Sequence, residues 1–132
     1  MTNDFSNLSL SNEYHGPNNI SIANGDALSI THNGTSSLST NSHTFKLQQL
    51  LCVPSISTNL LSVHKLCLDS HCIFDANMLQ IHDIHSGKIL YQGHSNNGLY
   101  LVHVSSTSQH PVFKSVQSSS DLQQAFSFEL LL

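Results

Sequence analysis

The stretch "VPSISTNLLSVHKLC", Val53 to Cys67, lies where one sequence pattern gives way to another. In the segment before it, Phe45 and Leu47 alternate with polar residues, and positions 50–53 are then continuously apolar. A run that loses its alternation in this way predicts a strand passing from half-covered to fully buried. Pro54 ends that strand, because proline has no backbone N–H to donate and favours extended geometry in the residue before it.

The second half of the stretch has the period of a helix. Residues recur at steps of three and four, as on one side of a short helix: Leu60, Leu61, His64 or Val63, Cys67 and Leu68. We expect this helix at about 62–69, with the Ser62 hydroxyl accepting from the backbone N–H of Lys65 as its N-cap. His64 and Cys67 are the two side chains in this helix that could take part in a chemical reaction.

The rest of the chain from Ile20 to about Val104 is dominated by period-two alternation, which predicts short strands. Asn24-Gly25 and Asn33-Gly34 are predicted as hairpin turns, because both pairs tolerate a positive φ. Further turns are predicted at 75–77, 86–87 and 96–98, between the segments "HCIFDA", "MLQIHDI", "KILYQG" and "LYLVHV". The fold class is therefore mainly β: a small, closed or partly open β-barrel with one short helix.

The chain divides by composition into three parts. Residues 1–104 are predicted to form the β-barrel domain, and 105–119 are Ser-rich and contain Pro111, as in a linker. The last part, 120–132, could form an amphipathic helix capped by Ser120, as if cut short at the end of the chain. The length of 132 residues is enough for one domain with a core of its own.

Charge and composition exclude several classes of protein. Four lysines stand against eight acids and there is no arginine, so a phosphate-binding surface for nucleic acid is not expected. No segment has the features of a secretory signal or the ~20 apolar residues of a membrane span. The three cysteines, an odd number in apolar runs, do not form a disulfide framework. We expect a protein of the cytoplasm or nucleus that is not secreted.

Ten histidines raise the question of a metal site. The closest spacings are His64-x-x-Cys67, His71-Cys72 and His82-x-x-His85, and none forms the two paired-ligand knuckles usual for zinc. His82 and His85 would point to opposite faces of a strand. The histidines are interpreted as polar surface, with Cys52, Cys67 and Cys72 as small core residues. Zinc-dependent folding is kept as an alternative.

Complete catalytic motifs are absent from the sequence. There is no G-x-S-x-G elbow, no Gly-rich phosphate loop and no cysteine in an activating motif. The local signature of an aspartic protease is Asp followed by Ser or Thr and then Gly, and here Asp69-Ser70 is followed by His71. We therefore predict no catalytic, metal or cofactor-binding residue, no cofactor and no small-molecule ligand.

The order Val-Pro-x-x-x-x-Asn-Leu-Leu-Ser-Val resembles the Pol polyproteins of copia-type LTR retrotransposons, which are abundant in plants. The matching positions are Val53, Pro54, Asn59, Leu60, Leu61, Ser62 and Val63. The resemblance extends over about 2–102 and includes "NGDALSITHNGTSSL" and "SGKILYQGHSNNGLYLV". It implies a retropepsin-like β-barrel followed by the start of a pre-integrase segment.

The same resemblance implies which chemistry is missing. In the family a catalytic Asp-Ser-Gly-Ala lies just before a His-Met-Thr stretch, whose end resembles Met1-Thr2. A zinc-binding motif that opens the integrase follows the family's linker. Neither the carboxylate nor the zinc ligands correspond to a residue here. Leu60, Leu61 and Ser62 correspond to an apolar pair that packs beneath the active-site loop.

We therefore expect a fragment of a Pol polyprotein, a protease-like β-barrel without activity of its own. One alternative is a domesticated interaction module that binds a partner strand or a second copy at an exposed sheet edge. Another is part of an active aspartic protease, if the reading frame continues upstream through Asp-Ser-Gly.

Overall fold

The computed structural model describes residues 1–105 and the backbone of 127–131. The chain divides into two compact units. The first comprises 1–38 and 45–60, and the second comprises 39–44 and the described residues from 61 onward. The predicted Ser-rich linker lies outside the described residues except for Ser105, and the extent of the predicted 1–104 domain stays a prediction.

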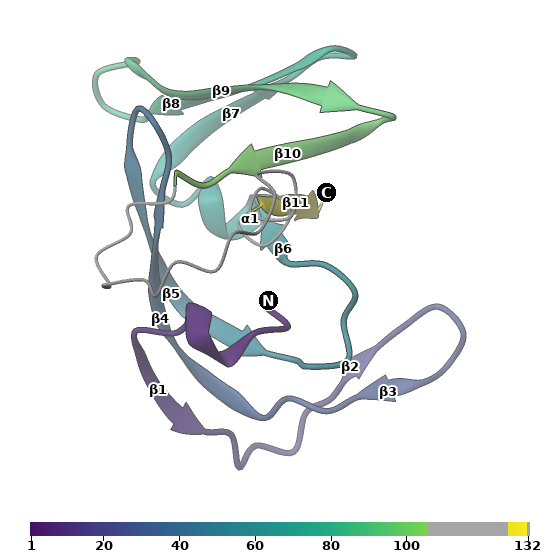
Figure 1. Cartoon of the computed structure of the whole chain (residues 1–132). Helices are drawn as coiled ribbons and strands as arrows, with labels where there is room; N and C mark the ends of the chain where they lie inside the picture. The colour runs from purple at the N-terminus through teal and green to yellow at the C-terminus, as the bar shows by residue number, and fades with distance from the viewer. Residues whose placement is uncertain (106–126, 132) are drawn as a thin grey trace, which may run out of the picture. The chain divides into compact units, whose positions relative to one another are not determined.

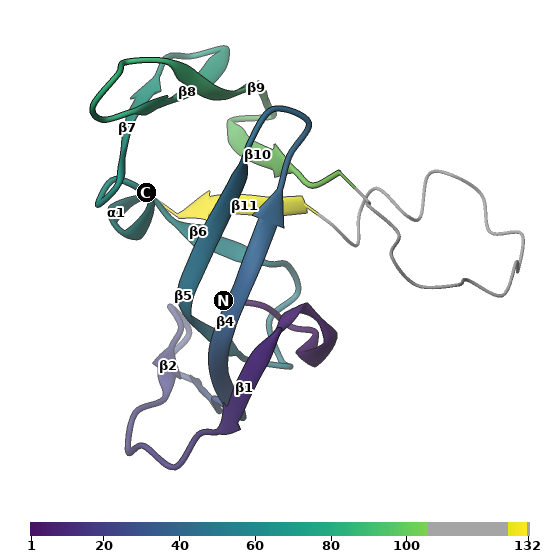
Figure 2. The same ribbon diagram turned by 90° about the vertical axis from the view of Figure 1, so that its left-hand side faces the viewer.

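The first unit is built on a three-stranded sheet. Its elements are a 3-10 helix, η1 (Phe5–Asn7), and the strands β1 (Leu10–Glu13), β2 (Ile20–Ser21), β3 (Ala27–Leu28), β4 (His32–Ser39) and β5 (Thr44–Cys52). The sheet order is β1-β4-β5, and Figure 2 shows these strands side by side. The strands β2 and β3 form a separate antiparallel hairpin. Its turn contains Gly25 at φ +90°, which confirms the turn predicted at Asn24-Gly25.

The second predicted turn, Asn33-Gly34, is wrong, because both residues lie inside β4 and pair with β1. A glycine is needed at position 34 because the backbone of β1 comes very close to it. A Cβ placed there would lie 1.9 Å from the carbonyl oxygen of Leu10. The sequence pair that favours a turn here serves close strand packing instead.

The long strand β5 changes its buried face in the middle. Phe45 is buried and Leu47 half-buried, whereas further along the buried positions are Leu50 and Cys52. The odd-to-even change occurs at Gln49, which has φ +58°. A local irregularity of this kind shifts all following side chains to the other face. The continuous apolar run thus marks a change of face, and Leu51 remains half-buried.

The prediction of a short helix after Pro54, with Ser62 as its N-cap, is confirmed. This helix is α1 (Val63–Leu66), and the Ser62 hydroxyl accepts from the backbone N–H of Lys65 at 3.3 Å. It ends earlier than the predicted 62–69, because Cys67 is already its C-cap. Its buried residue is Leu66, whereas His64 and Cys67 are exposed, so the predicted helical face is wrong by about a third of a turn.

The second unit contains a six-stranded sheet of order β6-β11-β10-β9-β8-β7. Its strands are β6 (Leu60–Ser62), β7 (Ser70–Phe74), β8 (Met78–Asp83), β9 (Ile89–Asn96), β10 (Leu99–His103) and β11 (Ser127–Leu131). The turns predicted at 75–77, 86–87 and 96–98 are confirmed, and Figure 1 shows β7 to β10 as successive antiparallel hairpins. Asn97 and Gly98 both adopt positive φ, as a tight hairpin turn requires.

The prediction of a helix over 120–132 is wrong for residues 127–131, because these residues form the strand β11. The strand pairs antiparallel with β10, with Val102 opposite Phe128. Without it the backbone N–H and C=O groups along that side of β10 would need other partners. Tertiary pairing has therefore overridden the local pattern, as is common for short amphipathic segments. The proposed cap, Ser120, lies outside the described residues.

Each unit has a small apolar core. In the first unit the buried hydrophobic residues are Ile30, Leu38, Phe45, Leu50, Cys52 and Val53. In the second unit they are Leu61, Leu66, Leu79, Ile81, Tyr91 and Val102. The Tyr91 hydroxyl is satisfied within this core, donating to the carbonyl of Leu101 and accepting from the N–H of His103. Buried polar groups of this kind keep neighbouring strands in register.

The prediction of a mainly β fold with one short α-helix is confirmed. None of the three sheets closes on itself among the described strands. No helix in the described part of the chain is long and apolar enough to cross a membrane.

Replacing Gly34 by alanine should destabilise the first unit. The new Cβ would collide with the backbone of β1, and overpacking of this kind costs roughly 1–3 kcal/mol. Gly16→Ala is the matched control, because the three atoms nearest its new Cβ all belong to the movable side chain of Tyr14. Urea unfolding of both variants checks this. Equal stability of the two would mean that β1 does not pack against Gly34.

Candidate functional site

The first two residues form a short strand that is paired on both sides. On one side Thr2 donates to the carbonyl of Leu51 at 2.9 Å, and its own carbonyl accepts from Val53 at 2.8 Å. These bonds make a parallel bridge between Thr2 and Cys52. On the other side the backbones of Met1 and Leu60 exchange hydrogen bonds of 2.6 and 2.9 Å. Met1 and Thr2 thus fill the space between the end of β5 and the start of β6.

The Thr2 side chain lies at the centre of a buried polar cluster. Its hydroxyl donates to the side-chain carbonyl of Asn59 at 2.8 Å. It accepts from the side-chain amide of Asn7 at 2.7 Å and from the backbone N–H of Asp4 at 3.3 Å. The same Asn59 oxygen accepts from the backbone N–H of Asn3 at 3.2 Å. We call Thr2, Asn7 and Asn59 the Thr2 cluster.

The Thr2 cluster uses the full hydrogen-bonding capacity of the threonine hydroxyl, which has one donor and two acceptor positions. Thr2 is 0% exposed and Asn59 is 6% exposed, so neither side chain can turn to water instead. A buried polar network of this kind is stable only when every member is paired, and it then fixes one arrangement of the chain. The cluster positions backbone and contains no group that could act as an acid, base or nucleophile near neutral pH.

The α-amino group of Met1 shares this enclosed environment. Burial lowers the pKa of the amine from its ordinary value, because the charged form loses hydration there. Its hydrogen bond to the Leu60 carbonyl needs only an N–H and is available in both protonation states. The amine therefore anchors the strand through hydrogen bonding rather than through its charge.

Of the histidines considered for metal binding, His71 and His82 lie directly opposite each other on β7 and β8. His64 is exposed on α1, and the His82 ring lies 3.0 Å from the carbonyl of Gly87 and 3.3 Å from the side chain of Gln80. His85 lies in the turn beyond β8, where its backbone N–H donates to Asp83. Among the described residues no group of three or more His, Cys, Asp or Glu side chains could hold a metal ion.

The cysteines occupy three different environments. Cys52 is buried, as expected for a small core residue, whereas Cys72 is half-buried and Cys67 is exposed. The interpretation as core residues is therefore wrong for Cys67. All three are free thiols.

The described carboxylates stabilise turns. Asp75 accepts from the backbone N–H groups of Asn77 and Met78, and Asp83 accepts from the side chain and backbone of Ser86. Hydrogen bonds from Ser86 hold the pKa of Asp83 below its ordinary value. Asp69, the one aspartate followed by serine, is exposed after α1. A water-activating pair needs two carboxylates in one pocket, and these acids lie in separate turns.

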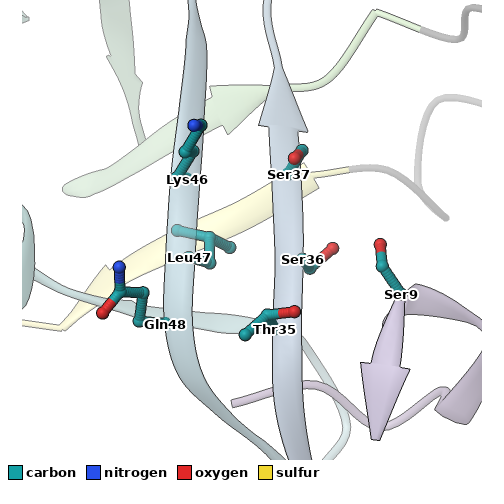
Figure 3. Close-up of a pocket in the computed structure, with 7 residues that line it drawn as sticks. All are labelled: Ser9, Thr35, Ser36, Ser37, Lys46, Leu47 and Gln48. Carbon is teal, nitrogen blue, oxygen red and sulfur yellow. The ribbon is translucent and has the colours of Figure 1, made fainter.

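A shallow depression lies on the β4–β5 face of the first unit, with a volume of about 190 Å³. Figure 3 shows the seven side chains that line it: Ser9, Thr35, Ser36, Ser37, Lys46, Leu47 and Gln48. Drug-sized ligand pockets span roughly 300–1,000 Å³ and are mostly apolar. This depression is smaller than that range, so it does not form a site for a drug-sized molecule.

The Thr2 cluster was not predicted from the sequence. Thr2 and Asn59 are separated by 57 positions, and their residue types are abundant throughout the chain. The one available signal was Asn59 itself, a polar residue directly before the apolar pair Leu60-Leu61. Apolar surroundings make an asparagine side chain seek a partner, but the sequence does not say which one.

Comparison with known proteins gives consistent matches. Residues 1–72 match the family described as "Pol polyprotein, beta-barrel domain". The "Retrovirus-related Pol polyprotein from transposon RE1" of Arabidopsis thaliana is 36% identical over 123 residues, which cover 91% of this chain and 8% of that protein. The corresponding protein from transposon RE2 of the same plant is 39% identical over 103 residues, 76% of this chain and 7% of that protein. The chain thus spans less than a tenth of either relative. No solved structure matches it.

Replacing Thr2 by valine should destabilise the first unit by roughly 1–3 kcal/mol, because it leaves the buried Asn59 carbonyl without its hydroxyl donor. Valine keeps the shape and the backbone pairing. Thr58→Val, at the half-exposed neighbour of Asn59, is the matched control and should change the free energy of unfolding much less. Denaturant unfolding monitored by circular dichroism checks this. A Thr2→Val protein as stable as the control would contradict a structural role for the cluster.

Proposed function

The chain belongs to the β-barrel domain family of the Pol polyproteins of copia-type retrotransposons, and we propose that it is the scaffold part of such a polyprotein's protease region, without peptide-cleaving activity of its own. In this proposal the domain holds an active-site segment in place, and the catalytic carboxylate belongs to that segment. The chemistry would be aspartic proteolysis, in which two subunits each supply one carboxylate to activate water.

One observation carries the proposal: the Met1–Thr2 strand is paired on both sides. Backbone bonds to Leu51, Val53 and Leu60 fix its position and direction. The hydrogen bond between the side chains of Thr2 and Asn59 fixes the same strand a second time. The resemblance of Met1-Thr2 to the end of the family's His-Met-Thr stretch supports placing the catalytic loop directly before this strand. A loop joined to a doubly paired strand is held firmly at that end, as a catalytic group requires.

The described acids support the second half of the proposal. Their carboxylates either accept hydrogen bonds in turns, as at Asp75 and Asp83, or are exposed, as at Asp69 and Glu13. A carboxyl group suited to sharing a proton with a second one needs burial beside it, which raises the pKa of one of the pair. Asp83 has the opposite environment, since the hydrogen bonds from Ser86 favour its charged form.

Purified protein of residues 1–132 should show no pepstatin-sensitive cleavage of internally quenched peptides at mildly acidic pH. A chain extended at its N-terminus by Asp-Ser-Gly-Ala-His is the informative companion, because the proposal predicts that the scaffold would then hold a catalytic loop. Its variant with Asn in place of that Asp is the matched control. Pepstatin-blocked cleavage by the unextended chain would overturn the proposal.

The runner-up is an interaction module that adds a strand at β7. This strand is the outer edge of the second unit's sheet, and its sequence, "SHCIF", contains neither lysine nor proline. Edge strands are commonly protected by such residues against pairing with another chain. On the outward face Ile73 is 47% exposed. An unprotected edge with an exposed apolar side chain favours β-augmentation by a second copy of the chain.

If β7 pairs between two copies, Ile73→Lys should shift the protein from dimer to monomer in light scattering. Gln80→Lys is the matched control, since Gln80 is the direct partner of Ile73 on β8 in the interior of the same sheet. The control should leave the dimer intact. A wild-type protein that is monomeric at high concentration would exclude self-pairing at this edge.

A further inference from the structure

Two of the three cysteines lie together in the second unit. Cys67 is the C-cap of α1, and its backbone N–H donates to the carbonyl of Val63 at 2.8 Å. Cys72 is the third residue of β7, the strand that α1 contacts. The chain turns back between them through the exposed residues Leu68 and Asp69. This reversal sets the end of α1 against β7, and the Cys67 thiol is close enough to Cys72 to contribute to its raised pKa.

The two thiols differ in their access to solvent. Cys67 is exposed and Cys72 is half-buried, with Ile81 directly opposite it on β8. Burial raises the pKa of the Cys72 thiol to about 12, with further contributions from its hydrogen bond to Cys67 and from the charge on Cys67. Cys72 therefore stays protonated near neutral pH, and Cys67 is the member of the pair that a dissolved reagent reaches.

We propose that Cys67 and Cys72 form an oxidisable dithiol, which hydrogen peroxide or an organic peroxide converts into an intramolecular disulfide. This modification site is independent of the proposed scaffold function. The geometry assigns an order to the two sulfurs: Cys67 reacts with the oxidant, and Cys72 resolves the product. Redox-active cysteines commonly combine an accessible thiol with a resolving partner close by.

The reaction balances in two steps. The thiolate of Cys67 attacks one peroxide oxygen, the O–O bond breaks, and the leaving oxygen takes up a proton to become water or an alcohol. Cys67 is then a sulfenic acid. The sulfur of Cys72 attacks the sulfur of Cys67, its proton passes to the departing hydroxide, and a water molecule leaves as the S–S bond forms. In total the two thiols lose two electrons and the peroxide gains them.

The bond would join the end of α1 to β7. Because only four residues separate the cysteines, the closed loop is short and little of the unfolded chain is constrained. The main structural consequence is local: α1 could no longer separate from the sheet edge. Only in the oxidised protein would the edge strand β7 be covalently linked to the end of α1.

The test is peroxide treatment of the reduced 132-residue protein, followed by alkylation and peptide mass mapping. Cys52 is an internal control, because it is 1% exposed. In reduced, folded protein, Cys67 should be alkylated at least about tenfold faster than Cys52, given its exposure. After stoichiometric peroxide the peptides containing Cys67 and Cys72 should be linked within one chain, with Cys52 still alkylatable.

Two variants separate the roles of the sulfurs. Cys72→Ser should stop at the sulfenic acid of Cys67, which dimedone traps, whereas Cys67→Ser should form neither product at that peroxide dose. Melting curves confirm that both variants are folded. Over-oxidation of Cys67 with Cys72 left as a free thiol would overturn the proposal, and so would a disulfide that forms only between chains.

Discussion

The buried hydrogen bond between the Thr2 hydroxyl and the Asn59 side chain is the constraint on which the first unit depends. It joins the start of the chain to the segment that follows Pro54, and it holds Met1 and Thr2 in place between β5 and Leu60. Without this short strand, the buried backbone groups at Leu51 and Val53 would lose their partners. Unpaired buried groups are expensive, so the pairing and the side-chain lock support each other.

The described polar side chains are used mainly to fix the backbone. Ser62 caps α1, Asp75 and Asp83 stabilise hairpin turns, and Tyr91 joins β9 to β10 through its hydroxyl. Most of these groups form hydrogen bonds with backbone close to them in the fold. This distribution agrees with the proposed scaffold role, in which another segment of the polyprotein would supply the reacting groups.

The second unit is stabilised differently. From β7 to β10, successive antiparallel hairpins place each strand beside its neighbour in sequence, so this part of the pairing requires only short loops. Its edge strand β7 carries both an exposed apolar side chain, Ile73, and the half-buried thiol of Cys72. The same strand is therefore the place where pairing with another chain and a covalent change at Cys67 could influence each other.

The sequence by itself determined the features that depend on local interactions. Period-two alternation and turn chemistry located the strands between Ser70 and His103, and the Ser62 cap located α1, because each signal acts within a few residues. The motif around Val53–Val63 identified the family. By contrast, the role of Gly34, the change of face at Gln49 and the strand at 127–131 were decided by tertiary structure.

The physical reason is that these outcomes depend on partners distant in sequence. Asn33-Gly34 has the composition of a turn, but the close approach of Leu10 requires a glycine inside a strand. The last residues fit a helix locally, but the free side of β10 offers backbone partners that a helix does not use. The Thr2–Asn59 bond and the Cys67–Cys72 pair likewise exist only once the chain has folded, since pairwise contact is a property of the fold and not of residue type.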